Sequence, residues 1–199
     1  GDYVAWADPH TWWPRDFIEG LLAVSRHLPE ATGVIYAPAH VLDGEGNQVR
    51  MVPGELKHTT MIRTLFQGAS IPLTTLLIRR RTLRPLEKTG MRFTLGNDHA
   101  LLLWLASQAP FEPSGGNLDP AEIHFIDGSL PPSLESTSQE RGEAMTYALE
   151  NFPGAVPSRF ARQCLAAFYC RRARALSMSG DSGQALSSAL QALMYRPLW

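Results

Sequence analysis

Four side chains near the start of the chain have the chemistry to bind a cation or a sugar. Asp8 offers a carboxylate, His10 offers an imidazole two positions later, and the aromatic pair Trp12-Trp13 follows. Residues two positions apart in an extended chain point to the same side of the backbone, so Asp8 and His10 can reach one ligand. An oxygen and an imidazole together suit Mn²⁺ better than Mg²⁺. The spacing therefore favours a divalent-cation site that holds manganese.

The two tryptophans suit either a substrate site or the core. An aromatic face packs well on the apolar face of a pyranose ring, whereas a tryptophan beside a helix start is commonly buried. Trp12 and Trp13 are adjacent, so they cannot both take the same environment in an extended chain. We expect one of the pair to face the core and the other to face a cleft that binds substrate.

A second polar group, Asn97-Asp98-His99, stands directly before an apolar segment that reads as a helix. An aspartate in that place can cap the helix by accepting hydrogen bonds from free backbone N–H groups. It can equally act as a general base. Both roles of Asp98 stay open on the residues alone. Asn97 and His99 flank it as substrate-site candidates, and we expect His99 at the rim of that site.

Two further candidates lie elsewhere in the chain. His124 can be a metal ligand or an ordinary polar residue on an edge strand. Arg79 opens the run Arg79-Arg80-Arg81, which can bind a phosphate on a lipid-linked acceptor or an anionic membrane surface. A solvated strand end is the alternative interpretation of these arginines.

Alternating strands and helices are predicted to position these residues. The apolar run 3–7 predicts a buried strand, and the spacing of apolar residues after Pro14 predicts a helix over residues 14–28. Further along, the sequence predicts a strand at 33–37, a turn at 43–47, a second hairpin strand at 49–52, a helix at 59–67, a buried strand at 73–78, a helix at 99–107 and an edge strand at 122–126 within a linker. This order predicts an α/β fold.

The C-terminal part has a different composition, rich in alanine, leucine, arginine and serine with helical periodicity. It predicts helices over residues 136–151, 158–178 and 183–195. We therefore divide the chain into an α/β domain over 1–130 and a helical extension over 131–199. The last two helices resemble one tetratricopeptide helix pair. A helical hairpin that caps the main domain is the alternative, because repeat arrays need about three units.

Composition and net charge exclude some kinds of partner and location for this protein. The chain has 199 residues and a formal net charge of -1, from 18 basic and 19 acidic residues. It has no overall field that would attract nucleic acid, so nucleic acid is excluded as the default partner. No apolar run approaches the roughly 20 residues of a bilayer span, and no signal peptide opens the chain. We expect a cytoplasmic protein, with peripheral membrane contact as an open alternative.

The opening residues also resemble a family motif. In family-two glycosyltransferases of the GT-A fold, a strand runs into Asp-x-Asp-Asp and then into Trp and Pro, as in Gly1-Asp2-Tyr3-Val4-Ala5-Trp6-Ala7-Asp8-Pro9-His10-Thr11-Trp12-Trp13-Pro14. Later features follow in the family's order, including the hairpin at 43–46, the strand ending in arginines, and Gly96-Asn97-Asp98 before Leu101-Leu102-Leu103-Trp104-Leu105. The similarity covers about residues 1–130. It implies a partial GT-A fold, which is a Rossmann-like mixed sheet, followed by the all-α extension.

The resemblance implies transfer of a sugar, with inversion, from a nucleotide-diphospho-sugar donor to a hydroxyl of a saccharide or lipid-linked acceptor, as in polysaccharide biosynthesis. A divalent cation at Asp8 would neutralise the diphosphate leaving group. Asp98 stands where the family has its general base, and His124 resembles a histidine that can reach the metal or the donor phosphate. Asn97 replaces the usual glutamate. His10 gives an Asp-x-His form, which related animal enzymes that transfer N-acetylgalactosamine to proteins also use.

The family's nucleotide-binding half precedes this motif and is not in the sequence. A lone second half would have an exposed sheet edge, which is a template for pairing with a partner chain or a second copy. A fragment, a domain that needs a partner, and a shortened pseudo-enzyme all remain open. The alternative function is accordingly a non-catalytic scaffold that binds a partner through its helical C-terminus.

Overall fold

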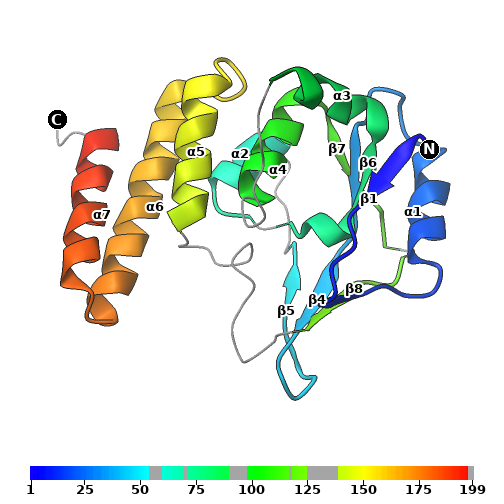
Figure 1. Cartoon of the computed structure of the whole chain (residues 1–199), viewed down its shortest axis with the longest axis horizontal. Coiled ribbons are helices and arrows are strands. Elements are labelled where there is room, and N and C mark those ends of the chain that lie inside the picture. The colour runs from blue at the N-terminus through cyan, green and yellow to red at the C-terminus, as the bar shows by residue number, and fades with distance from the viewer. Residues whose placement is uncertain (54–59, 70, 90–97, 117, 125–138, 197–199) are drawn as a thin grey trace.

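The computed structural model describes residues 1–53, 60–69, 71–89, 98–116, 118–124 and 139–196. Strands and helices alternate over the first part of the chain, and helices alone follow (Figure 1). In the figure, α1 (Phe17–Ser25) lies at one end beside the strands, and the row α5 (Gln139–Asn151), α6 (Ser158–Met178) and α7 (Ser182–Tyr195) lies at the other end. The predicted α/β fold with a C-terminal helical extension is confirmed.

The first of two sheets has the strand order β1-β6-β3-β7. Its strands are β1 (Tyr3–Ala5), β6 (Leu76–Arg79), β3 (Val34–Tyr36) and β7 (Phe111–Pro113). β6 runs antiparallel to both of its neighbours, and β3 runs parallel to β7. The strand predicted at 73–78 begins only at Leu76, because Leu73–Thr75 forms a 3₁₀ turn, η1. β7 lies in the stretch that the sequence indicated as a linker.

The opening strand differs from its prediction. It was expected to be buried, but β1 is an edge strand and none of its residues is buried. Trp6, just after it, is 46% exposed. The buried strands of this sheet are β6 and β3, each of which has a neighbour on both sides. An apolar run indicates a strand but does not indicate which strands it will pair with. The sequence alone therefore could not distinguish an edge strand from a central strand.

The second sheet has the order β2-β8-β4-β5. Its strands are β2 (Thr11–Trp12), β8 (Ala121–His124), β4 (Ala39–Leu42) and β5 (Gln48–Val52). The predicted hairpin turn is present, with Asp43 N–H donating to Asn47 O at 2.9 Å. The strand that pairs with β5 is β4, whereas β3, which was predicted as that partner, belongs to the first sheet. β8 was expected at an edge and lies between β2 and β4, because the unpredicted two-residue strand β2 covers its outer side.

The helices cover both faces of the strands in two apolar clusters. Phe17 and Leu21 of α1 pack with the inner residues of both sheets, including Ile35, Val41 and Ile123. On the other face, α2 (Met61–Phe66) and α4 (Asp98–Gln108) pack against β3 and β6 together with α5 and α6. α1 starts at Phe17 rather than Pro14. α3 (Arg80–Thr89) was not predicted, because Pro85 inside it usually ends a helix.

The three C-terminal helices are confirmed, with α7 starting one residue earlier than predicted. α5 approaches α6 closely because Gly142 has no side chain, and a Cβ there would lie 2.6 Å from Cε1 of Phe168. Arg141 of α5 is buried and donates a hydrogen bond to the Ala69 carbonyl. Cys164 and Cys170 are free thiols. None of the helices in the described residues combines the length and apolarity of a membrane span.

Candidate functional site

A tight turn holds Asp8 at the end of β1. The Asp8 side chain accepts a hydrogen bond from His10 N–H at 2.8 Å, and its backbone carbonyl accepts one from Thr11 N–H at 3.1 Å. Aspartate favours this conformation because its short carboxylate reaches the backbone two residues on. Asp8 keeps an exposed carboxylate, with one oxygen outside the turn's side-chain hydrogen bond. The turn therefore presents a hard oxygen ligand in a fixed direction.

The turn leads directly into β2, which places His10 beside His124. β2 pairs with β8 in the register Thr11 with Ile123 and Trp12 with Glu122, and His124 N–H donates to His10 O at 2.9 Å. The backbones of His10, in the turn just before β2, and of His124 therefore lie side by side at the end of β8. These two predicted ligands are 114 positions apart in the sequence.

Trp12 and Trp13 divide between surface and core, as the sequence indicated. Trp12 is 66% exposed, and its ring centroid lies 5.3 Å from that of His124. Trp13 stacks on Phe17 with centroids 5.8 Å apart, and its Nε1–H donates to the Thr74 carbonyl at 2.9 Å. Trp13 is thus a structural anchor, while Trp12 presents an aromatic face that can stack on a sugar ring.

Asp98 is the first residue of α4, and Asp8 acts on it electrostatically. Burial raises the pKa of the Asp98 carboxyl, and the negative charge of Asp8 raises it further. Two carboxylates influence each other in this way only when they are close. Asp8 and Asp98 are thus within electrostatic range of each other, although they are 90 positions apart in the sequence. A carboxylate with a raised pKa binds a proton more readily, which a general base requires.

The described residues do not form a complete set of protein ligands for a metal ion. Among the described residues, no three His, Cys, Asp or Glu side chains group closely enough to hold a metal ion. His124 Nε2 instead lies 3.3 Å from Glu122 Oε2. However, Asp8 and Asp98 repel each other, and a divalent cation between carboxylates relieves such repulsion. Ions of the magnesium class commonly take one or two carboxylates and obtain their other ligands from phosphates and water.

His99 lies inside the protein, so its expected place at the rim of the site is wrong. It is 7% exposed and packs in the core side of α4. Burial lowers the pKa of His99 well below its usual value, and the positive charge of Arg141 lowers it further. Burial, Arg171 and Arg50 in turn lower the pKa of Arg141 to about 10. The imidazole is therefore neutral at pH 7.

We expect this neutral histidine to make folding sensitive to acid. The unfolded state takes up a proton on His99 below about pH 6.5, whereas the folded state does not, so stability is complete above that pH and decreases below it. The free energy of unfolding should fall by about 1.4 kcal/mol for each pH unit below 6.5 because of this group. Urea denaturation at pH 7.5, 6.0 and 5.5 measures it. His99→Leu removes this contribution, so parallel pH curves for both proteins would contradict the expectation.

Arg79 does not join the Asp8 group. It pairs with Tyr3 in the register of β1 and β6, at the end of β1 opposite to the one that leads to Asp8. Its guanidinium lies over the Tyr3 ring, 5.5 Å from the centroid. Asn97, the remaining substrate-site candidate, lies outside the described residues. Among the predicted residues, the segment from Asp8 to Trp12 adjoins His124 through the pairing of β2 with β8, Asp98 is linked to Asp8 through electrostatics alone, and Arg79 is distant.

Two residues in the site were missed by sequence reasoning. Thr74 of η1 holds the segment after Asp8, since its hydroxyl accepts from the Thr11 hydroxyl at 3.1 Å and its carbonyl accepts from Trp13. Glu122 lies opposite Trp12 and pairs with His124. The alternation of Glu122 and His124 along one strand could have shown that they share a face. Nothing local to Thr74 indicated its contacts.

Comparisons with known proteins support the fold. The crystal structure of S. aureus TarS 1–349, a glycosyltransferase, in complex with UDP-GlcNAc matches 99% of this chain with a TM-score of 0.61. The sequences are 13% identical, and the match spans 58% of the TarS chain. No family model matches the sequence, and no curated protein matches it significantly. A likeness at this identity shows the fold alone, and that fold is glycosyltransferase-like.

Proposed function

We propose that this chain carries the cation- and acceptor-binding part of a family-two glycosyltransferase. The reaction would transfer a sugar, with inversion, from a nucleotide-diphospho-sugar to an acceptor hydroxyl. The main support for the proposal is that burial and, to a smaller extent, the negative charge of Asp8 raise the pKa of the Asp98 carboxyl. A general base and a cation ligand must lie close together if the hydroxyl attacks the carbon from which the cation-bound diphosphate departs.

Asp98 is the general base of the proposed reaction. The acceptor hydroxyl gives its proton to the Asp98 carboxylate as its oxygen forms a bond to the anomeric carbon, and the diphosphate leaves with the electrons of the broken bond. The raised pKa of Asp98 favours this proton transfer. Its place in the first turn of α4 also allows a capping role, which does not conflict with proton transfer.

Asp8 is the proposed protein ligand for the cation, and its other ligands would come from the diphosphate and water. The described residues do not bring His10 and His124 together with Asp8 as a three-ligand site. When bound, a divalent cation, with Mn²⁺ preferred over Mg²⁺, stabilises the negative charge of the leaving diphosphate. The backbone bond between His10 and His124 joins the turn to the end of β8, and the turn fixes the Asp8 carboxylate. This rigidity supports a preorganised site, since each ligand is oriented before substrate arrives.

The exposed Trp12 side chain supports a class of acceptor, and the structural neighbour TarS supports a class of donor. Trp12 is a broad exposed aromatic next to His124, which suits stacking of an acceptor saccharide or of the sugar part of a lipid-linked acceptor. TarS was crystallised with UDP-GlcNAc, which supports a nucleotide-diphospho-sugar as donor here.

Replacing Asp8 by Asn is expected to weaken Mn²⁺ binding at least about tenfold, because the protein offers few other ligands. Asparagine keeps the side-chain oxygen that accepts from His10, so the turn should persist. Calorimetric titration of Mn²⁺, alone and with UDP-GlcNAc, measures the change. Glu19→Gln, which removes an exposed carboxylate of α1, is the matched control. Equal affinity of wild type and Asp8→Asn would exclude Asp8 as the ligand.

A non-catalytic scaffold is the second candidate function. The observation in its favour is an exposed apolar face on α7, where Leu186 is 63%, Leu190 55% and Met194 77% exposed. Such a face on a helix suits a protein partner. The Mn²⁺ titration separates the two functions, because the scaffold predicts no binding heat from wild type.

A further inference from the structure

A cavity lined by arginines lies at the end of β1 and β6 that is opposite to Asp8. Its volume is about 390 Å³, and its lining residues are Gly1, Asp2, Tyr3, Arg79, Arg80, Arg81 and Arg84. The lining thus contains four arginines and one acidic residue, Asp2. The register of Tyr3 with Arg79 places this cavity beyond one end of the strand pair, while Thr74 and Asp8 lie beyond the other. It is therefore distinct from the proposed catalytic site.

The local chain geometry concentrates positive charge in this cavity. β6 ends at Arg79 and α3 begins at Arg80, so the arginines surround the first turn of a helix. The N-terminus of a helix carries a partial positive charge of its own, and basic side chains are unfavourable there unless an anion compensates them. Arg80 and Arg84 are four positions apart, so they lie on the same face of α3. No acidic residue occupies the described first turn.

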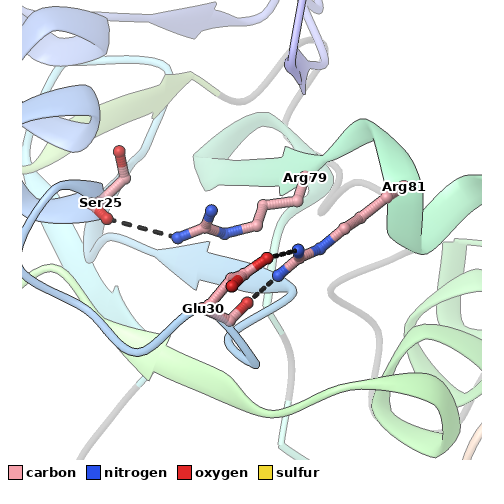
Figure 2. A network of polar contacts seen from close by, with 4 residues as sticks. All are labelled: Ser25, Glu30, Arg79 and Arg81. Carbon is pink, nitrogen blue, oxygen red and sulfur yellow. Dashed lines mark hydrogen bonds and ion pairs between the residues drawn. The ribbon is translucent and has the colours of Figure 1, made fainter.

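The structure fixes two of the four arginines and leaves two without a partner. Figure 2 shows Arg81 against Glu30, with Nη1 2.6 Å from Oε1, and Arg79 reaching the Ser25 carbonyl with an Nη2–O distance of 3.4 Å. The Nε of Arg79 is buried and has no hydrogen-bond partner. The side chains of Arg80 and Arg84 make no hydrogen bond or ion pair within the described residues, and both residues are exposed. Guanidinium groups in this state are available to an anion.

A second cavity adjoins the first one. It has a volume of about 540 Å³ and shares Asp2, Tyr3 and Arg79 with its neighbour. Its other lining residues include the apolar side chains Leu22 and Leu28. A charged cavity beside a partly apolar one suits a molecule that has an anionic head and an organic remainder. Both volumes lie within the usual range of about 300–1,000 Å³ for ligand pockets.

We propose that the four-arginine cavity binds the phosphate group of a phosphate ester. Arg80 and Arg84 supply the charge-assisted hydrogen bonds, and Arg79, held over the Tyr3 ring, forms the wall between the two cavities. The planar guanidinium fork matches the oxygens of phosphate in a bidentate way. The organic part of the ester occupies the neighbouring cavity, between Tyr3 and Leu22. This proposal does not depend on glycosyl transfer.

The test uses inorganic pyrophosphate as the probe and the full chain as the protein. Titrations contain EDTA and no divalent cation, so the carboxylates of Asp8 and Asp98 repel the probe from the other site. Arg80→Gln/Arg84→Gln is expected to weaken pyrophosphate binding at least about tenfold, because it removes two charged donors. Arg159→Gln/Arg162→Gln on α6 changes the net charge equally at two exposed positions and should leave binding unchanged.

A second arm identifies the source of the phosphate. Cosedimentation with phosphatidylglycerol vesicles that depends on Arg80 and Arg84, and is absent with phosphatidylcholine, would identify a lipid head group. Pyrophosphate binding without cosedimentation would identify a phosphate on a soluble ester. Absence of pyrophosphate binding by wild type would overturn the proposal, even if vesicles bind. An equal loss of affinity in both double variants would overturn it too, since that outcome reflects net charge alone.

Discussion

Asp98→Asn is expected to lower the rate of sugar transfer by about 10²–10⁴-fold, which is the usual contribution of a general base. The asparagine side chain has nearly the same shape but cannot accept a proton from the acceptor hydroxyl. At the first position of α4, the substitution loses only the favourable interaction of a negative charge with the helix N-terminus, about 0.3–1 kcal/mol, so α4 should remain stable. A structural role alone would therefore leave transfer unchanged.

The assay for this variant is release of UDP from UDP-GlcNAc with a panel of saccharide and lipid-linked acceptors. Wild-type activity should rise with pH through the pKa of Asp98, since only the carboxylate accepts a proton. That pKa is raised by burial and by the Asp8 charge, so the rise should come at a higher pH than for an ordinary aspartate. The Glu19→Gln control should match wild type. A transfer rate for Asp98→Asn equal to that of wild type would refute the assignment.

The coupling between the two carboxylates can be measured without any turnover. Asp8→Asn removes the negative charge that acts on Asp98, so the Asp98 pKa should decrease. The chemical shift of the Asp98 carboxyl carbon, followed by NMR against pH, reports this change directly. An unchanged titration in Asp8→Asn would show that the two residues do not share a site, and the proposed function would lose its main support.

Phe168→Ala is expected to have the largest effect on folding, about 3–5 kcal/mol of the free energy of unfolding. Phe168 of α6 is 1% exposed and makes an edge-to-face contact with Tyr169, with ring centroids 5.1 Å apart. Its ring fills the space above Gly142 of α5. Truncation leaves a cavity between the two helices, because the backbone cannot close over it fully. Urea denaturation followed by circular dichroism measures the loss.

Substitution of Gly142 tests the same contact between α5 and α6 more specifically. In the wild-type background, Gly142→Ala places a Cβ 2.6 Å from Phe168 Cε1 and 3.0 Å from the Tyr169 hydroxyl, which should cost about 1–3 kcal/mol. In the Phe168→Ala background, the same methyl group enters the new cavity, so its cost should largely disappear. Leu186→Ala, at an exposed position of α7, is the control and should change stability by less than about 0.5 kcal/mol. Additive effects of the two substitutions would contradict the packing described here.

Short-range features of this protein were predictable because they depend on neighbours in the sequence. The bounds of α6 agree with its periodicity, since apolar residues at three- and four-residue spacing fix one helix face wherever the helix packs. The turn at residues 43–47 follows from Asp43, whose carboxylate accepts from the backbone of Glu45 and Asn47. The division of Trp12 and Trp13 between surface and core follows from adjacency. A resemblance in motif order also predicted the glycosyltransferase-like fold.

The sequence by itself thus determined the α/β order, the helical extension and the residue types of the site. Only the tertiary structure decided which strands are neighbours, and so it placed β1 at an edge and β8 in the middle of its sheet. The same long-range pairing brought Asp8 near Asp98, set His10 beside His124, and moved Arg79 to a separate cavity. The physical reason is that strand pairing joins residues about a hundred positions apart, and no periodicity within one segment specifies its partner.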